Sequence, residues 1–135
     1  MEFSAAFEER FVQVQKEVGR GGARPGPLLE SWEHLVWRCE HGYDDNIDEL
    51  LHDFQNRHSI EFVLGSASLN EYPEMVKFRE LVSELDRRFE KLQIRDPDLR
   101  WVKDPWWQSY PLRLGGKELA EDYWNMFGIR IQIVP

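Results

Sequence analysis

Apolar residues return every three or four positions through five stretches of the chain, the spacing that places them on one side of an α-helix. The most regular stretch follows Pro73, where the rhythm holds for about five turns and the intervening positions carry charges of both signs. The pattern predicts helices over about 4–18, 28–41, 45–54, 73–92 and 117–127.

Residues that favour helix ends flank these stretches. Ser4 is a good N-cap for the first helix, and Asp44 or Asp45 is expected to cap the third. Glycine commonly follows the last turn of a helix, so Gly42 and Gly128 are expected to end the second and the last.

The remaining segments predict loops and a little β-structure. Residues 19–27 are rich in glycine and proline and predict a mobile loop. Residues 129–134 alternate apolar and polar like a strand, whose partner is expected at 99–103, with 60–64 or a second subunit as alternatives. The apolar residues within 59–65 are too dense to separate helix from strand.

These elements predict one globular domain over residues 1–135, mainly α with a small β element near the C-terminus, in the α or α+β class. The chain is 41% hydrophobic, which is enough to build a core and argues against disorder. No apolar run approaches the roughly 18 residues that span a bilayer. A single cysteine, Cys39, favours a reducing, cytoplasmic setting.

The negative charge is concentrated in one segment. Residues 40–61 hold seven acids and the single base Arg57, so they contribute −6 of the net charge of −8. Such a surface is a poor partner for nucleic acid or for an acidic membrane, because both are bound by neutralising negative charge. A basic protein is the expected partner.

Within this segment, a helical wheel places four acids opposite the apolar side of the third helix: Asp45, Asp48, Glu49 and Asp53. Three of them follow one another at intervals of four, Asp45, Glu49 and Asp53, and are expected to form one solvated stripe. Because like charges at this spacing repel, we expect their removal to leave stability unchanged and to slow association with a basic partner.

The same segment holds three of the four histidines, which raises the question of a metal. A calcium loop starting at Asp44 fails, because Glu49 and Gln55 stand where glycine and glutamate are required. A transition-metal site would have to use His41, Asp48 and His52. We expect neither a metal nor another cofactor, and interpret these residues as a solvated helix face.

Catalytic signatures are lacking. Ser66 and Ser68 lie outside any Gly-x-Ser-x-Gly turn, and Cys39 shares the apolar side of its helix, where a buried inert thiol is expected. No residue is therefore assigned a catalytic role.

The least ordinary stretch is aromatic and flanked by bases, and two interpretations stay open for it. The rings could cover the hydrophobic core where regular structure stops, or they could line a groove for a ligand or partner, because Trp, Tyr and Arg dominate binding hot spots. The residues concerned are Arg100, Trp101, Trp106, Trp107, Tyr110 and Arg113.

Together these features favour a non-catalytic, acidic protein-binding domain. In size and charge it has the general character of immunity proteins and inhibitors, which neutralise basic toxins by charge complementarity. The alternative is a small-molecule or metal-binding domain, with or without enzymatic activity, that uses the Trp-rich region 100–113. A homodimer through the C-terminal strand is a further expectation.

Overall fold

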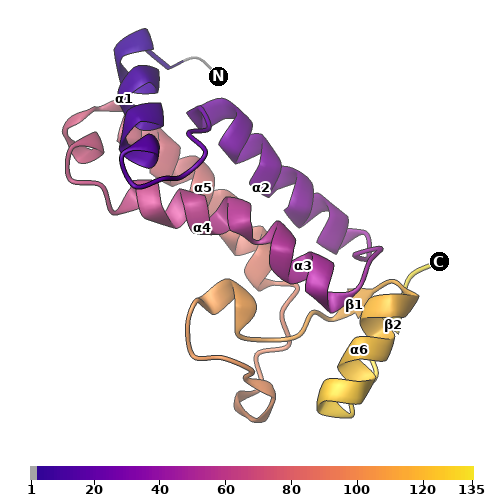
Figure 1. Ribbon diagram of the computed structural model, residues 1–135. Helices are drawn as coiled ribbons and strands as arrows, with labels where there is room; N and C mark the ends of the chain where they lie inside the picture. Colours follow the sequence, from indigo (N-terminus) through magenta and orange to yellow (C-terminus); the bar gives the residue numbers. More distant parts are fainter. Residues whose placement is uncertain (1–2) are drawn as a thin grey trace. The chain divides into compact units, whose positions relative to one another are not determined.

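The structure, a computed structural model, describes residues 3–135 and is mainly α-helical with a small β element near the C-terminus, as the sequence predicts (Figure 1). The helices are α1 (Ala5–Lys16), α2 (Pro25–Glu40), α3 (Ile47–Asp53), α4 (Gln55–Leu64), α5 (Glu74–Glu90) and α6 (Lys117–Phe127). Short 3₁₀ turns lie at η1 (Leu69–Glu71), η2 (Pro97–Leu99) and η3 (Trp106–Gln108), and the strands are β1 (Leu114–Gly115) and β2 (Gln132–Ile133).

Helix caps explain where α1 and α3 begin. The Ser4 hydroxyl accepts a hydrogen bond from the Phe7 amide at 3.3 Å, which confirms the predicted N-cap of α1. The prediction that Asp44 or Asp45 caps α3 is wrong, because Asn46 accepts from the Glu49 amide at 2.9 Å. α3 therefore begins at Ile47.

Two further boundaries differ from the pattern. α2 begins at Pro25, inside the predicted loop 19–27, because proline is well tolerated in the first turn of a helix. The ambiguous stretch 59–65 is helical through Leu64: Ile60 and Val63, three positions apart, share the buried side of α4.

Internal contacts group the chain into two compact units. Unit 1 comprises residues up to Glu33 together with Gln55–Leu85, and unit 2 comprises His34–Phe54 together with Asp86–Pro135. α2 and α5 each begin in unit 1 and end in unit 2. The expectation of one domain over 1–135 stays a prediction.

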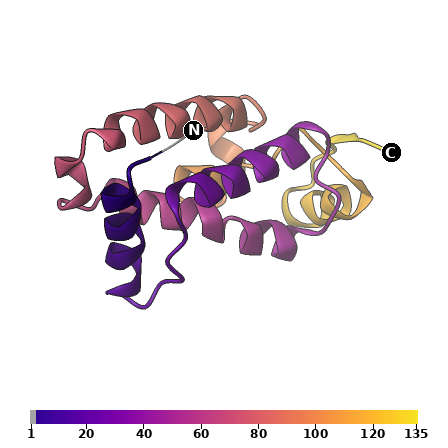
Figure 2. The same cartoon turned by 90° about the horizontal axis from the view of Figure 1, so that it is seen from above.

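In unit 1, α1 packs against α4 and the η1 turn (Figure 2). Phe7 and Phe11 of α1 are fully buried, and the Phe11 ring meets Phe78 of α5 edge-on at 5.2 Å between centroids. The Arg10 guanidinium donates to the Ser68 hydroxyl at 3.0 Å. Aromatic packing and these side-chain bonds hold α1 to the rest of the unit.

In unit 2, α6 connects two parallel strands, with Leu114 opposite Gln132 and Gly115 opposite Ile133. The helix packs close to β1: a Cβ atom on Gly115 would lie 2.9 Å from the Leu119 side chain. Glycine at this position therefore allows the helix and strand to meet.

The C-terminal strand was expected to pair with 99–103, and this is wrong. Trp101 instead donates its amide to the Ser109 carbonyl at 2.7 Å, so part of that backbone is satisfied inside its own loop. The C-terminal strand pairs with Leu114–Gly115, which the chain reaches by one helical crossover through α6.

Candidate functional site

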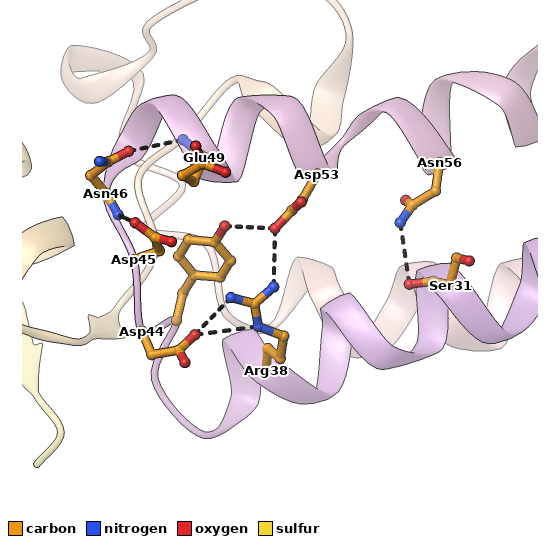
Figure 3. A network of polar contacts seen from close by, with 9 residues as sticks. Ser31, Arg38, Asp44, Asp45, Asn46, Glu49, Asp53 and Asn56 are labelled. Carbon is orange, nitrogen blue, oxygen red and sulfur yellow. Dashed lines mark hydrogen bonds and ion pairs between the residues drawn. The ribbon is translucent and has the colours of Figure 1, made fainter.

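The acidic segment is organised around one arginine near the end of α2 (Figure 3). Arg38 donates to Asp44 at 2.7 Å and to Asp53 at 3.0 Å. The Tyr43 hydroxyl donates to the same Asp53 carboxylate at 2.6 Å, and the Arg38 guanidinium lies 4.5 Å from the centre of the Tyr43 ring. Asp53 thus joins the last turn of α3 to α2 and to the loop between them.

Tyr43 anchors this network in the core. Its side chain is fully buried, and burial together with the Asp53 hydrogen bond raises the pKa of the Tyr43 hydroxyl. The phenol therefore remains protonated and donates its hydrogen. Gly42 precedes it with φ +95°, a backbone conformation that residues other than glycine rarely adopt.

Asp53 does not belong to a solvated stripe, so that expectation is wrong. Its side chain is 28% exposed and bonded to both Arg38 and Tyr43. Asp45 precedes the first helical residue, so it does not continue the helical spacing of Glu49 and Asp53 either. The helical wheel placed Asp53 wrongly because it takes no account of the residues that pack against α3.

Two more carboxylates of the segment are also compensated by arginines. Glu40 receives a bidentate pair from Arg88 at 3.1 and 2.7 Å, and this hydrogen bonding holds the pKa of Glu40 below its usual value. Glu61 receives Arg57 at 3.0 Å within α4. With Asp44 and Asp53, four of the seven acids are therefore in ion pairs.

The three acids that remain are Asp45, Asp48 and Glu49, which we call the acidic surface. Asp48 and Glu49 are exposed and form no ion pair within residues 3–135. Asp45 is half-buried and accepts from the Asn46 amide at 2.8 Å. Close by, Asp122 of α6 accepts from the Ile47 amide at 2.8 Å. Acidic residues are stabilised at a helix N-terminus, which explains how this concentration of charge is tolerated.

The histidines of the segment do not assemble a metal site. The His41 ring lies against that of Trp37, tilted by 30° and 4.3 Å away between centroids, and its Nδ1 lies 2.9 Å from the Trp37 carbonyl oxygen. Within the described part of the chain, no three His, Cys, Asp or Glu side chains are grouped so that they could hold a metal ion. His41, Asp48 and His52 therefore do not form a shared site.

Cys39 is poorly suited to nucleophilic chemistry. It is a free cysteine with no exposed area, and burial raises the pKa of its thiol. The Ser68 hydroxyl is used by Arg10 and lies 3.3 Å from that of Ser66. Neither group is arranged as an activated nucleophile.

In the aromatic segment, the rings pack on one another and leave little space. Trp107 is 2% exposed and meets Trp106 edge-on at 5.7 Å, while Trp101 contacts Phe127 at 6.4 Å. The cavity beside them, partly lined by Tyr110, holds about 10 Å³, no more than one water molecule could occupy. For Trp107 this geometry favours the interpretation that the ring covers the core, whereas Trp101 is 40% exposed.

The flanking cations of that segment are directed at backbone. Arg100 donates to the Lys103 carbonyl at 3.2 Å and Arg113 to the Lys91 carbonyl at 3.3 Å. The cation placed over Tyr110 is Arg95, at 5.7 Å from the ring centre. Arg100 and Arg113 therefore do not converge on a ligand site among the rings.

A cleft of about 660 Å³ between α6 and the C-terminal strand was missed by the sequence analysis. Trp124, 48% exposed, stands in it, with the Arg130 guanidinium 4.5 Å from its ring centre. The signal was present in α6: Ala120 and Trp124 lie beside, not within, the stripe formed by Leu119 and Tyr123. The cleft is lined by Lys117, Ala120, Glu121, Trp124, Asn125, Ile129, Arg130, Ile131 and Ile133.

Comparison of the chain with protein-family models, with curated proteins and with solved structures gave no match. Among residues 3–135, no helix is long and apolar enough to cross a bilayer.

Proposed function

We propose that this chain is a non-catalytic protein-binding domain whose acidic surface, Asp45, Asp48 and Glu49, binds a basic protein. The observation that carries the proposal is the state of the seven acids in residues 40–61. Four are paired with arginines, and the other three form no ion pair within residues 3–135 and are neighbours at one end of α3. Uncompensated neighbouring charges attract an oppositely charged partner and speed its association.

The support beneath these three acids also favours a binding role. α3 has only seven residues, too few to be stable alone, yet it is fixed at both ends. Asn46 caps its beginning, Asp122 binds the amide of Ile47, and Asp53 ties its last turn to Arg38 and Tyr43. A surface held in place before binding loses less conformational entropy when the partner arrives.

An inhibitor or immunity-type role, in which the chain neutralises a basic toxin, is the specific form of this proposal. It is supported by the net charge of −8 and by the inert environment of Cys39. The buried free thiol also supports a cytoplasmic setting, where thiols are kept reduced. The proposal requires no nucleic acid, membrane, metal or cofactor.

The test is affinity capture from the source cell at low salt, comparing three forms of the immobilised chain. The first is wild type, and the second carries Asp45→Asn, Asp48→Asn and Glu49→Gln. The third removes the same charge from unit 1 through Glu9→Gln, Glu30→Gln and Glu33→Gln, which are exposed and have no ion pair within the described residues.

The proposal expects one basic protein to be retained by wild type and by the unit 1 variant, released by salt, and lost from the acidic-surface variant. Equal retention by all three forms, or retention of acidic proteins only, contradicts it. Circular dichroism of each variant separates lost binding from lost folding.

A further inference from the structure

We propose that the cleft between α6 and β2 is occupied by β2 of a second copy of this chain, with the two β2 strands paired antiparallel about a two-fold axis. This surface is separate from the acidic surface, and the inference does not depend on the proposed function.

The first observation is the open edge of β2. The amides of Gln132 and Val134 donate to carbonyls of the β1 segment at 3.0 and 2.9 Å. Successive residues of a strand direct their backbone groups to opposite edges, so those of Ile131 and Ile133 point away from β1. Within residues 3–135, β1 is the one strand paired with β2. An unpaired strand edge is a template for another strand.

The second observation is the apolar cleft on the same side of β2. Ile131 and Ile133 line it from the strand, and Ala120 and Trp124 line it from α6. Ile133 is 59% exposed, and Trp124 is 48% exposed although the Arg130 guanidinium lies over its ring, so residues 3–135 leave a large part of this apolar surface uncovered. If a strand is added to the open edge, its alternate side chains lie under α6 and cover both Ile133 and Trp124.

The C-terminal strand itself has the chemistry that this place requires. In an antiparallel pair with Ile131 opposite the partner's Ile133, both residues exchange hydrogen bonds across the edge, and the two-fold axis repeats them. Four main-chain bonds result. The isoleucines of both copies then lie on the face that carries the cleft. The β2 segment therefore supplies both the strand edge that is paired and the strand that fills the partner's cleft.

Charge also favours a second copy at this place over other faces. The whole chain carries −8, which makes two copies repel, but the cleft is lined by Lys117 and Arg130 against the single acid Glu121. A rim with both signs is self-complementary under two-fold symmetry, because bases of one copy can face the acid of the other. The exposed Trp124 supplies the large aromatic contact typical of a hot spot.

The first test is sedimentation equilibrium of the full chain from about 1 µM to about 1 mM, near neutral pH. We expect a monomer–dimer equilibrium. Ile133→Lys places a charge in the paired edge and should weaken the dimer at least about tenfold, because strand edges are blocked by lysine. Val76→Lys is the matched control, since Val76 is 64% exposed on α5, and it should dimerise like wild type.

The second test checks the register by disulfide formation. In the proposed pairing Gln132 faces the partner's Gln132 in a non-hydrogen-bonded pair, whose Cα atoms lie about 4.5 Å apart, within the range that a disulfide bridges. Under mild oxidation Gln132→Cys should give a covalent dimer. Gln13→Cys, exposed on α1, should not, and buried Cys39 should contribute nothing.

Three results overturn the inference. The first is a wild-type chain that stays monomeric at every concentration, which leaves the cleft to an extended segment of another protein. The second is an Ile133→Lys chain that dimerises as tightly as wild type. The third is crosslinking of Gln132→Cys no faster than that of Gln13→Cys.

Discussion

The Tyr43 hydroxyl donates a 2.6 Å hydrogen bond to the Asp53 carboxylate, joining the loop after α2 to the last turn of α3. Asp53 also accepts a hydrogen bond from Arg38 at 3.0 Å, so one carboxylate accepts from two donors. The acid at the end of α3 thereby becomes part of the scaffold, while the acids at its beginning remain available at the surface. This division is the basis for assigning a binding role to Asp45, Asp48 and Glu49.

Removing the Tyr43 hydroxyl tests that scaffold. Tyr43→Phe should lower the free energy of unfolding by roughly 1–2 kcal/mol, the range for a hydrogen bond to a charged group that stays partly solvated. Tyr72→Phe is the control, since no hydrogen bond of the Tyr72 hydroxyl occurs within the described residues, and its effect should stay within about 0.5 kcal/mol. Urea denaturation measures both. Equal costs would show that the Tyr43–Asp53 bond contributes no stability.

The regular apolar side of α5 gives a prediction for unit 1. Phe78 is fully buried against Phe11, so Phe78→Ala should cost about 3–5 kcal/mol. Val76 lies two positions earlier and is 64% exposed, so Val76→Ala should change stability by less than about 0.5 kcal/mol. Chemical denaturation of both variants is the measurement. A small effect at Phe78 would contradict the packing of α1 on α5.

The Glu40–Arg88 pair predicts a pH dependence. Hydrogen bonding from Arg88 lowers the pKa of Glu40 in the folded state below its ordinary value of 4.5, so the carboxylate stabilises the fold above that pH. This contribution is lost as pH falls through the lower, folded-state pKa. Glu40→Gln should therefore be less stable than wild type at pH 7, and the difference should be smaller at pH 3.

Denaturation at the two pH values tests this, with Glu30→Gln as the control for removing one exposed charge. Glu30 forms no ion pair within residues 3–135, so its variant should differ little from wild type at either pH. A Glu40→Gln deficit that persists unchanged at low pH would assign the effect to packing instead of charge.

Replacing Gly115 or Gly26 with alanine should have different effects on stability, because only Gly115 lies where α6 packs closely on β1. A Cβ atom at Gly115 would lie 2.9 Å from Leu119 and 3.2 Å from Ile131, so Gly115→Ala should cost about 1–3 kcal/mol. At Gly26, in the first turn of α2, a Cβ would meet nothing within 4 Å. Gly26→Ala should leave stability unchanged or raise it by up to about 1 kcal/mol. Thermal melting distinguishes the two, and matching effects would contradict the described contact.

Much of the helical framework could be predicted from the sequence, because burial of one helix side imposes a period that needs no tertiary information. α6 was predicted with its observed bounds, because a glycine, Gly128, follows its last residue. In the structure Gly128 adopts φ +67°, the conformation that ends a helix. The strand partner could not be predicted. β1 has two residues, Leu114 and Gly115, too few for any alternation to show.

The candidate site was harder to predict because it depends on contacts between distant residues. The helical wheel placed Asp53 with the solvated acids, but Asp53 is bonded to Arg38, which lies fifteen positions away in sequence. The same limit applies to the cap of α3: three adjacent residues could each serve, and Asp44 was already bonded to Arg38. Composition located the excess charge but could not tell paired acids from unpaired ones.

The proposed function requires that Asp45, Asp48 and Glu49, at the beginning of α3, speed the capture of a basic protein. The measurement that tests this is the association rate constant of the basic protein retained by wild type, at about 10 mM and about 150 mM salt. The Asp45→Asn, Asp48→Asn, Glu49→Gln variant should associate at least about tenfold more slowly than wild type at low salt, and this gap should narrow at high salt as screening weakens steering. The Glu9→Gln, Glu30→Gln, Glu33→Gln variant, with the same net charge, should stay within about twofold of wild type. Equal rates for wild type and the acidic-surface variant at both salt concentrations would contradict the account.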